Sequence, residues 1–292
     1  MTVTRESLRF VDSHVHHWDP ANLDWFPHLA PEFDVSALGV EGAEGMKRRY
    51  NQPEYLADAT RWGLDKYVHV SATSGPKKYL DETAFLAGLG GPLAGLVGTV
   101  DLDGDPSQVV AELAGQAEQP LFKGIRNMHI PDWDAPAFHA VLDELQSRGL
   151  VYDLVVHPDT MDRAVALLSR YPDLAVVVEH AGWPHTTGDE ERGAWRTGMR
   201  KLAELGPRLS CKLSGVAMFT HTTDLAAVRP WCDELIELFG SERVLVGSNF
   251  PVDGVFGSFD SMMAAYLEII GAHGDAAVGA AFAANAERIY GI

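Results

Sequence analysis

Four histidines of this chain follow short apolar segments, where the ends of strands are expected. His14 and His16 stand in VDSHVHHW, His157 in YDLVVHP and His180 in LAVVVEHAGWP. Because alternate residues of an extended chain point to the same side, His14 and His16 face one side together. Two neutral imidazoles at this spacing can hold a divalent metal or flank a reacting carbonyl group. We predict that these four histidines form one catalytic group.

Basic and hydroxyl side chains follow other apolar segments. Arg126, in LFKGIRN, can bind a carboxylate or a carbonyl oxygen through two parallel hydrogen bonds. Lys212 and Ser214 alternate in CKLSG, so both can reach the same side. We predict that these three side chains bind substrate; for Lys212, a lysine that is salt-bridged inside the fold is an equal alternative.

The last apolar segment leads into VLVGSNFPVDG, which carries Asn249 and, four residues later, Asp253. An aspartate at the first of these positions would accept a proton from an attacking water. Asparagine cannot, because it has no titratable carboxylate.

These residues need a scaffold that brings distant strand ends together. β-Branched runs predict eight strands, at Leu8–Asp12, Lys66–Val70, Leu96–Val100, Phe122–Ile125, Val151–Val155, Ala175–Glu179, Leu209–Leu213 and Val244–Val246. Helical spacing appears between or after them at Pro106–Gln116, Pro136–Arg148, Met161–Tyr171, Trp231–Phe239, Met262–Ile270 and Ala276–Tyr290.

The alternation of strands and helices predicts a closed parallel (β/α)8 barrel, the TIM barrel. Catalytic residues of such barrels lie at the carboxyl ends of the strands. An open doubly wound sheet would carry a glycine-rich phosphate-binding turn after its first strand, where this chain has His14-Val15-His16. We therefore predict one α/β domain over residues 1–292.

The stretch from His17 to Asn51 breaks this alternation and is rich in aromatic residues and proline. Long loops in compact domains are usually functional, and a loop after strand one lies on the catalytic face. We predict a lid or a pocket wall, with simple packing of the aromatic side chains as the alternative. Trp18, and Trp183 after His180, are predicted to offer stacking surfaces to a substrate.

The composition limits the partners. The 41 acidic and 23 basic residues give a net charge of −18, which repels phosphate backbones and anionic membranes. No apolar run approaches the roughly 20 residues of a membrane-spanning helix, and the first residues do not resemble a secretion signal. Cys211 and Cys232 lack metal-ligand spacing and are predicted to be reduced thiols. We expect a cytoplasmic protein with a small-molecule substrate and without nucleic-acid or membrane partners; a homo-oligomer remains open.

Together, the motifs VDSHVHHWDP, KGIR, EHAGWP, CKLSG, GSNFPVDG and NAERIYG resemble the amidohydrolase superfamily. More narrowly, they resemble its amidohydrolase-2 branch, which includes sugar-acid lactonases and pyrone-dicarboxylate lactonase. The resemblance covers nearly the whole chain and implies attack of water on an ester or lactone carbonyl. It maps the family's histidines onto His14, His16, His157 and His180, and its strand-eight aspartate onto Asn249.

From this resemblance we expect a hydrolase that opens a lactone or a related cyclic ester. Arg126 and the histidines would polarise the carbonyl, Asn249 would help to place the water, and Asp253 or a histidine would remove its proton. Catalysis without a cofactor is favoured slightly, because four neutral histidine ligands would leave a dication uncompensated. Otherwise the four histidines hold one divalent metal, with zinc as the first guess.

Two other classes of function stay open. A metal-dependent non-oxidative decarboxylase of the same superfamily would share the barrel and the histidines, although Asn249 counts against it. A non-catalytic barrel that binds a small ligand would explain the missing aspartate but not the retained histidines and basic residues.

Overall fold

Eight parallel strands, each hydrogen-bonded to the next in chain order, form the centre of the molecule. The computed structural model describes residues 3–38, 40, 42–73, 75, 78–130 and 132–292. The strands are β1 (Phe10–Val15), β2 (Leu64–Val70), β3 (Leu93–Gly98), β4 (Phe122–Asn127), β5 (Val151–Leu154), β6 (Ala175–Val178), β7 (Leu209–Leu213) and β8 (Val244–Val246).

The chain after β8 closes the ring against β1. The backbone N–H of His16 donates to the carbonyl of Phe250 at 2.9 Å, and that of Asn249 donates to the carbonyl of His14 at 2.8 Å. The predicted (β/α)8 barrel is therefore confirmed, with its strands buried as parallel strands under a layer of helices are. The first strand is displaced from the predicted Leu8–Asp12, so that His14 lies inside β1 and only His16 follows it.

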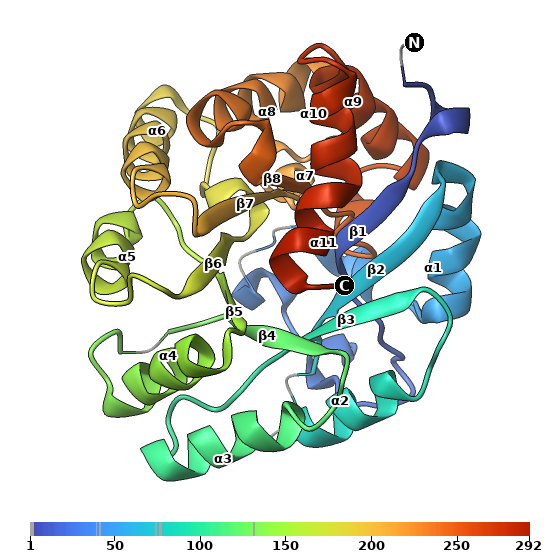
Figure 1. Ribbon diagram of the computed structural model, residues 1–292. Coiled ribbons are helices and arrows are strands. Elements are labelled where there is room, and N and C mark those ends of the chain that lie inside the picture. Colours follow the sequence, from blue (N-terminus) through green and yellow to red (C-terminus); the bar gives the residue numbers. More distant parts are fainter. Residues whose placement is uncertain (1–2, 39, 41, 74, 76–77, 131) are drawn as a thin grey trace.

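Helices surround the ring of strands, as Figure 1 shows. They are α1 (Gln52–Ala59), α2 (Tyr79–Ala87), α3 (Pro106–Gln116), α4 (Pro136–Arg148), α5 (Met161–Leu168), α6 (Asp189–Ala203), α7 (Val216–Thr220), α8 (Leu225–Phe239), α9 (Phe259–Gly271), α10 (Asp275–Gly279) and α11 (Asn285–Tyr290). Local sequence explains their ends: Asp105 accepts a hydrogen bond from the backbone of Ser107 at the start of α3, and Gly149 has a φ of 65° after α4.

The last helical segment covers the end of the barrel opposite the catalytic face. A π-helical turn, Ala280–Ala284, joins α10 to α11. Phe282 of this turn packs edge-on against Phe10 of β1, and Tyr290 of α11 belongs to the apolar cluster at that end. Figure 1 shows α11 and the C-terminus in front of the strands. We call this end the floor of the barrel.

The described residues between β1 and α1 form loops and short 3₁₀ turns, at Pro27–Leu29, Val35–Leu38 and Ala43–Met46. An isolated antiparallel bridge between Trp18 and Tyr50 ties the two ends of this stretch together. No helix within the described residues is long and apolar enough to cross a membrane.

Candidate active site

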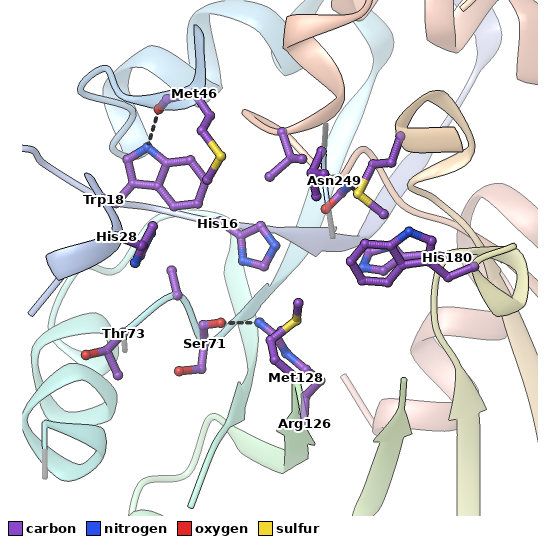
Figure 2. A pocket seen from close by; sticks show the side chains of 15 residues that line it. His16, Trp18, His28, Met46, Ser71, Thr73, Arg126, Met128, His180 and Asn249 are labelled. Atoms are coloured by element: carbon purple, nitrogen blue, oxygen red, sulfur yellow. Dashed lines mark hydrogen bonds between the residues drawn. The ribbon is translucent and has the colours of Figure 1, made fainter. Parts of the chain in front are cut away.

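A cavity of about 110 Å³ opens at the carboxyl ends of the strands. Figure 2 shows side chains from several strand ends pointing into it. The stretch after β1 contributes Trp18, His28, Val40 and Met46, so the predicted pocket wall is present. The other described lining residues are His16, Ser71, Ala72, Thr73, Arg126, Met128, His180, Trp183, Met218, Asn249 and Val252.

His14 and His16 meet at the centre of the barrel. Their Nε2 atoms lie 3.1 Å apart. His16 Nδ1 lies 2.8 Å from the carbonyl oxygen of Val70, which can only accept, so Nδ1 carries the hydrogen and Nε2 keeps its lone pair. Burial holds the pKa of both imidazoles well below the ordinary value, and both are therefore neutral near pH 7.

His180 approaches the same point from the end of β6. Its Nδ1 lies 3.0 Å from the hydroxyl of Ser214, and burial lowers its pKa to about 3. The backbone of His180 has a φ of 51°, a conformation that few non-glycine residues adopt. Gly215 allows the close approach, because a Cβ there would lie 2.6 Å from His180 Nδ1.

Glu179, which immediately precedes His180, brings a carboxylate into this group. Its Oε1 lies 3.2 Å from His14 Nδ1, and its Oε2 lies 3.6 Å from His180 Nε2. That Oε2 has no hydrogen-bond partner among the described residues. Burial opposes the charged form of Glu179, but the neighbouring His14 and Lys212 hold its pKa well below the usual value.

Lys212 lies beneath the histidines and does not line the cavity. Its ammonium group lies 2.5 Å from Asp153, 3.5 Å from Glu179 and 3.3 Å from His14 Nδ1. The hydroxyl of Tyr290 donates to Asp153 from the floor, at 2.8 Å. The structure thus supports the salt-bridged alternative for Lys212, and it places Ser214 against His180 and not in the cavity lining.

Arg126 is the one charged side chain of the described cavity lining. It comes from β4, is 5% exposed, and donates from Nη2 to the carbonyl oxygen of Ser71. Its Nε has no hydrogen-bond partner among the described residues. A buried guanidinium with a free donor is suited to bind an oxygen atom of a ligand.

Asn249 lines the cavity at the end of β8, and Asp253 lies behind it. The Asn249 amide donates to Asp253 Oδ1 at 2.9 Å, while Asp253 Oδ2 accepts from the backbone of Gly215 at 3.1 Å. Burial raises the pKa of Asp253 to about 7. The carboxylate is fully buried and outside the lining, so it orients Asn249 and does not itself face the cavity.

His157 lies apart from this group. Its Nδ1 contacts the carbonyl oxygen of Trp183 at 2.8 Å, and its ring stacks on His185 with centroids 4.5 Å apart. It follows β5 by three residues and is not among the described cavity lining. Of the four predicted histidines, the structure therefore brings together His14, His16 and His180.

The interpretation of the sequence missed two carboxylates that contact the candidate catalytic group or the lysine beneath it. Glu179 stands next to a predicted histidine, and Asp153 stands in the middle of a buried strand, in VYDLVV. A charged residue within an apolar strand is a signal in itself, because such a residue is rarely buried without a partner.

A family model described as Amidohydrolase matches residues 11–292. The chain belongs to the amidohydrolase family. It is 30% identical to the uncharacterized protein y4mH of Sinorhizobium fredii, over 90% of this chain and 91% of that protein. It is 29% identical to the L-fucono-1,5-lactonase of Burkholderia ambifaria, over 85% of this chain and 82% of that one.

Among solved structures, an amidohydrolase from Burkholderia multivorans with bound Zn superposes with a TM-score of 0.81 at 25% identity. The superposition covers 97% of this chain and 99% of the other. The protein is therefore an enzyme of the amidohydrolase type, in the lactonase-like branch of the family, and acts on small molecules.

Proposed function

We propose that this enzyme hydrolyses a lactone or a related cyclic ester by attack of water on the ring carbonyl. One observation carries the proposal: a guanidinium that is only partly hydrogen-bonded among the described residues lines the same cavity as neutral imidazoles. In such an arrangement the guanidinium can polarise a carbonyl group while a nearby imidazole accepts a proton from water. The relatives named as lactonases agree with this chemistry.

In this mechanism each side chain has one task. The guanidinium of Arg126, which lines the cavity, donates to the carbonyl oxygen and stabilises the negative charge that develops there. The side-chain oxygen of Asn249, whose amide nitrogen is held by Asp253, accepts one hydrogen of the water and orients it. His16 Nε2, with its lone pair fixed by the contact of Nδ1 with Val70, receives the other proton. The charge of Glu179 nearby stabilises the imidazolium that forms. The ring C–O bond of the ester then breaks, and His16 returns the proton to the departing ring oxygen.

The same residues fit a divalent metal. Ligand atoms of His14, Glu179 and His180 all lie within 4.8 Å of one another, and Glu179 Oε2 has no other partner among the described residues. A carboxylate with two imidazoles is a donor set that zinc accepts. Glu179 also supplies the negative charge that a set of four histidines lacks. A metal held by these residues would polarise the carbonyl group or lower the pKa of a water molecule.

A lactone panel with a pH indicator tests the proposal, because each opened ring releases one proton. We expect turnover by the purified enzyme and loss of that turnover in Arg126→Met. Elemental analysis of protein purified without chelator, followed by assays before and after dialysis against a chelator, tests the metal. Absence of turnover across the panel, with CO₂ released from aromatic acids, would instead favour the decarboxylase.

A further inference from the structure

We propose that the substrate carries a largely hydrocarbon ring and is not a polyhydroxylated sugar lactone. This inference rests on the proposed lactone hydrolysis and specifies its substrate class. It differs from the substrate in the names of the Burkholderia relatives, and it follows from what the cavity offers to the part of the ring outside the ester.

The apolar part of the described wall around the catalytic group consists of Ala72 and of seven larger side chains, which are Trp18, Val40, Met46, Met128, Trp183, Met218 and Val252. Three of these seven side chains are methionines, which are flexible and adapt to apolar surfaces without offering a strong hydrogen-bond donor or acceptor. Met128 lies at the edge of the cavity and is 42% exposed, so a bound ring can cover it.

The hydroxyl groups of the lining donate their hydrogens elsewhere. The Ser71 hydroxyl donates to Glu82 Oε2 at 2.5 Å, and the Thr73 hydroxyl donates to the carbonyl oxygen of Trp25 at 2.9 Å. Glu82 has its other oxygen occupied by the backbone N–H groups of residues 72 and 73. These contacts hold the β2–α2 connection in place and leave neither hydroxyl hydrogen for a substrate.

The remaining polar groups of the described lining act on the ester or lie beside it. Arg126, Asn249, His16 and His180 belong to the catalytic group, and the Asn249 amide donates to Asp253. Outside these roles the described lining offers the imidazole of His28, whose ring packs edge-on against Trp18, and the indole N–H of Trp183. These two polar side chains are fewer than the three hydroxyl groups of a sugar lactone ring.

Hydroxyl groups that are buried here without partners would weaken binding. Each polar group that loses its water without gaining a hydrogen bond lowers affinity by a factor of roughly five to a hundred. A lactone with an unsubstituted or alkylated ring avoids this loss and gains contact with the methionine and tryptophan side chains.

A matched pair of lactones tests the inference. δ-Hexalactone and L-fucono-1,5-lactone share a six-membered ring, the ring ester and a methyl substituent, and they differ by three hydroxyl groups. We expect kcat/KM, divided by the uncatalysed hydrolysis rate of each lactone, to be at least about tenfold higher for δ-hexalactone. An equal or higher value for L-fucono-1,5-lactone would overturn the inference and leave the proposed lactonase activity intact.

A pair of variants checks that the wall is responsible. Met46→Gln keeps the length of the side chain and adds a donor and an acceptor, so the preference for δ-hexalactone should shrink several-fold. Met46→Leu keeps the wall apolar and should leave the preference unchanged. A Met46→Gln preference equal to that of the wild type would contradict the assignment of this wall to the substrate ring.

If neither lactone is hydrolysed, the proposed function fails, and both compounds can be titrated as unreacted ligands. The fluorescence of Trp18 and Trp183 should then report tighter binding of δ-hexalactone. Tighter binding of L-fucono-1,5-lactone, or no binding of either compound, would overturn the inference.

Discussion

The floor of the barrel and its cavity differ in how fully their polar groups are paired and in the conformation of their backbone. At the floor, Tyr290, Asp153 and Lys212 form an unbroken chain of short contacts, and all three side chains are buried. At the cavity, the backbone has positive φ angles at the non-glycine residues His180, Ala181, Trp183 and Asn249. There Arg126 Nε and Glu179 Oε2 also lack partners among the described residues.

This difference indicates that the floor stabilises the fold, whereas the cavity carries the groups that act on the substrate. Strained backbone and unpaired polar groups each cost free energy and persist only where surrounding structure enforces them. In (β/α)8 barrels the catalytic residues lie at one end of the strands, and the other end contributes stability. Substitutions at the cavity should therefore mainly change activity, and substitutions at the floor should mainly change stability.

The largest effect on stability is expected for Lys212→Met. Removing the ammonium group leaves Asp153 and Glu179 buried without their common counter-charge. The free energy of unfolding should fall by about 3–5 kcal/mol, measured by urea denaturation. Lys123→Met, which removes a lysine whose ammonium donates to the backbone carbonyl of Gly291 at 3.3 Å, is the control and should change the free energy of unfolding by less than about 1 kcal/mol. Equal losses of stability in both variants would show that the contacts of Lys212 with Asp153 and Glu179 make no special contribution to the fold.

The largest effect on activity is expected for Arg126→Met. Loss of the donor that faces the carbonyl should lower kcat/KM by roughly 10²–10³-fold. The melting temperature should hold or rise, because the variant removes a buried cation with an unpaired Nε. Arg170→Met on the surface should leave both quantities unchanged. A large fall in melting temperature without a fall in kcat/KM would show that Arg126 stabilises the fold and does not act in catalysis.

A smaller effect, on both quantities, is expected for Tyr290→Phe. The phenyl ring keeps its packing, but Asp153 loses a hydrogen bond, so the free energy of unfolding should fall by about 1–2 kcal/mol. Because Asp153 holds Lys212 against His14, kcat should also fall, by about tenfold, with little change in KM.

The control for this variant is Tyr171→Phe, which removes a hydroxyl that contacts His139 away from the cavity. It should lower stability without lowering kcat. If Tyr290→Phe lowers only stability as well, the floor and the catalytic group act independently.

The smallest effect is expected for Glu287→Gln, on the outside of the floor. Hydrogen bonds from Arg9 and Lys66 lower the pKa of Glu287 to about 2, from an ordinary value of 4.5. A lowered folded-state pKa means that this contribution to stability is complete above about pH 4.5 and is lost as the pH falls toward 2. The variant should cost below about 1 kcal/mol at pH 7, with no difference from the wild type near pH 2. A difference that persists at pH 2 would rule out the ion pairs as its cause.

The sequence predicts the scaffold better than it predicts the partners of each catalytic group. Buried parallel strands appear as apolar runs, so their number and order can be predicted from local patterns. Helix α6 is not predicted from the sequence because its residues are largely polar, although Trp195, Met199 and Leu202 show helical spacing. His157 was predicted to join the catalytic histidines because it follows a strand, and nothing in the sequence around it indicates that it stacks on His185 instead. Contacts between distant side chains depend on barrel geometry, which no local pattern contains.

The backbone at Asn249 bears on how this active site could evolve. Its φ of 52° is tolerated by aspartate about as well as by asparagine, so an aspartate could replace Asn249 without moving the chain. Two carboxylates would then face each other where the amide now donates to Asp253, and they would have to share a proton. We therefore expect the effects of substitutions at positions 249 and 253 to depend on one another, because a change of charge at one position alters the pKa at the other.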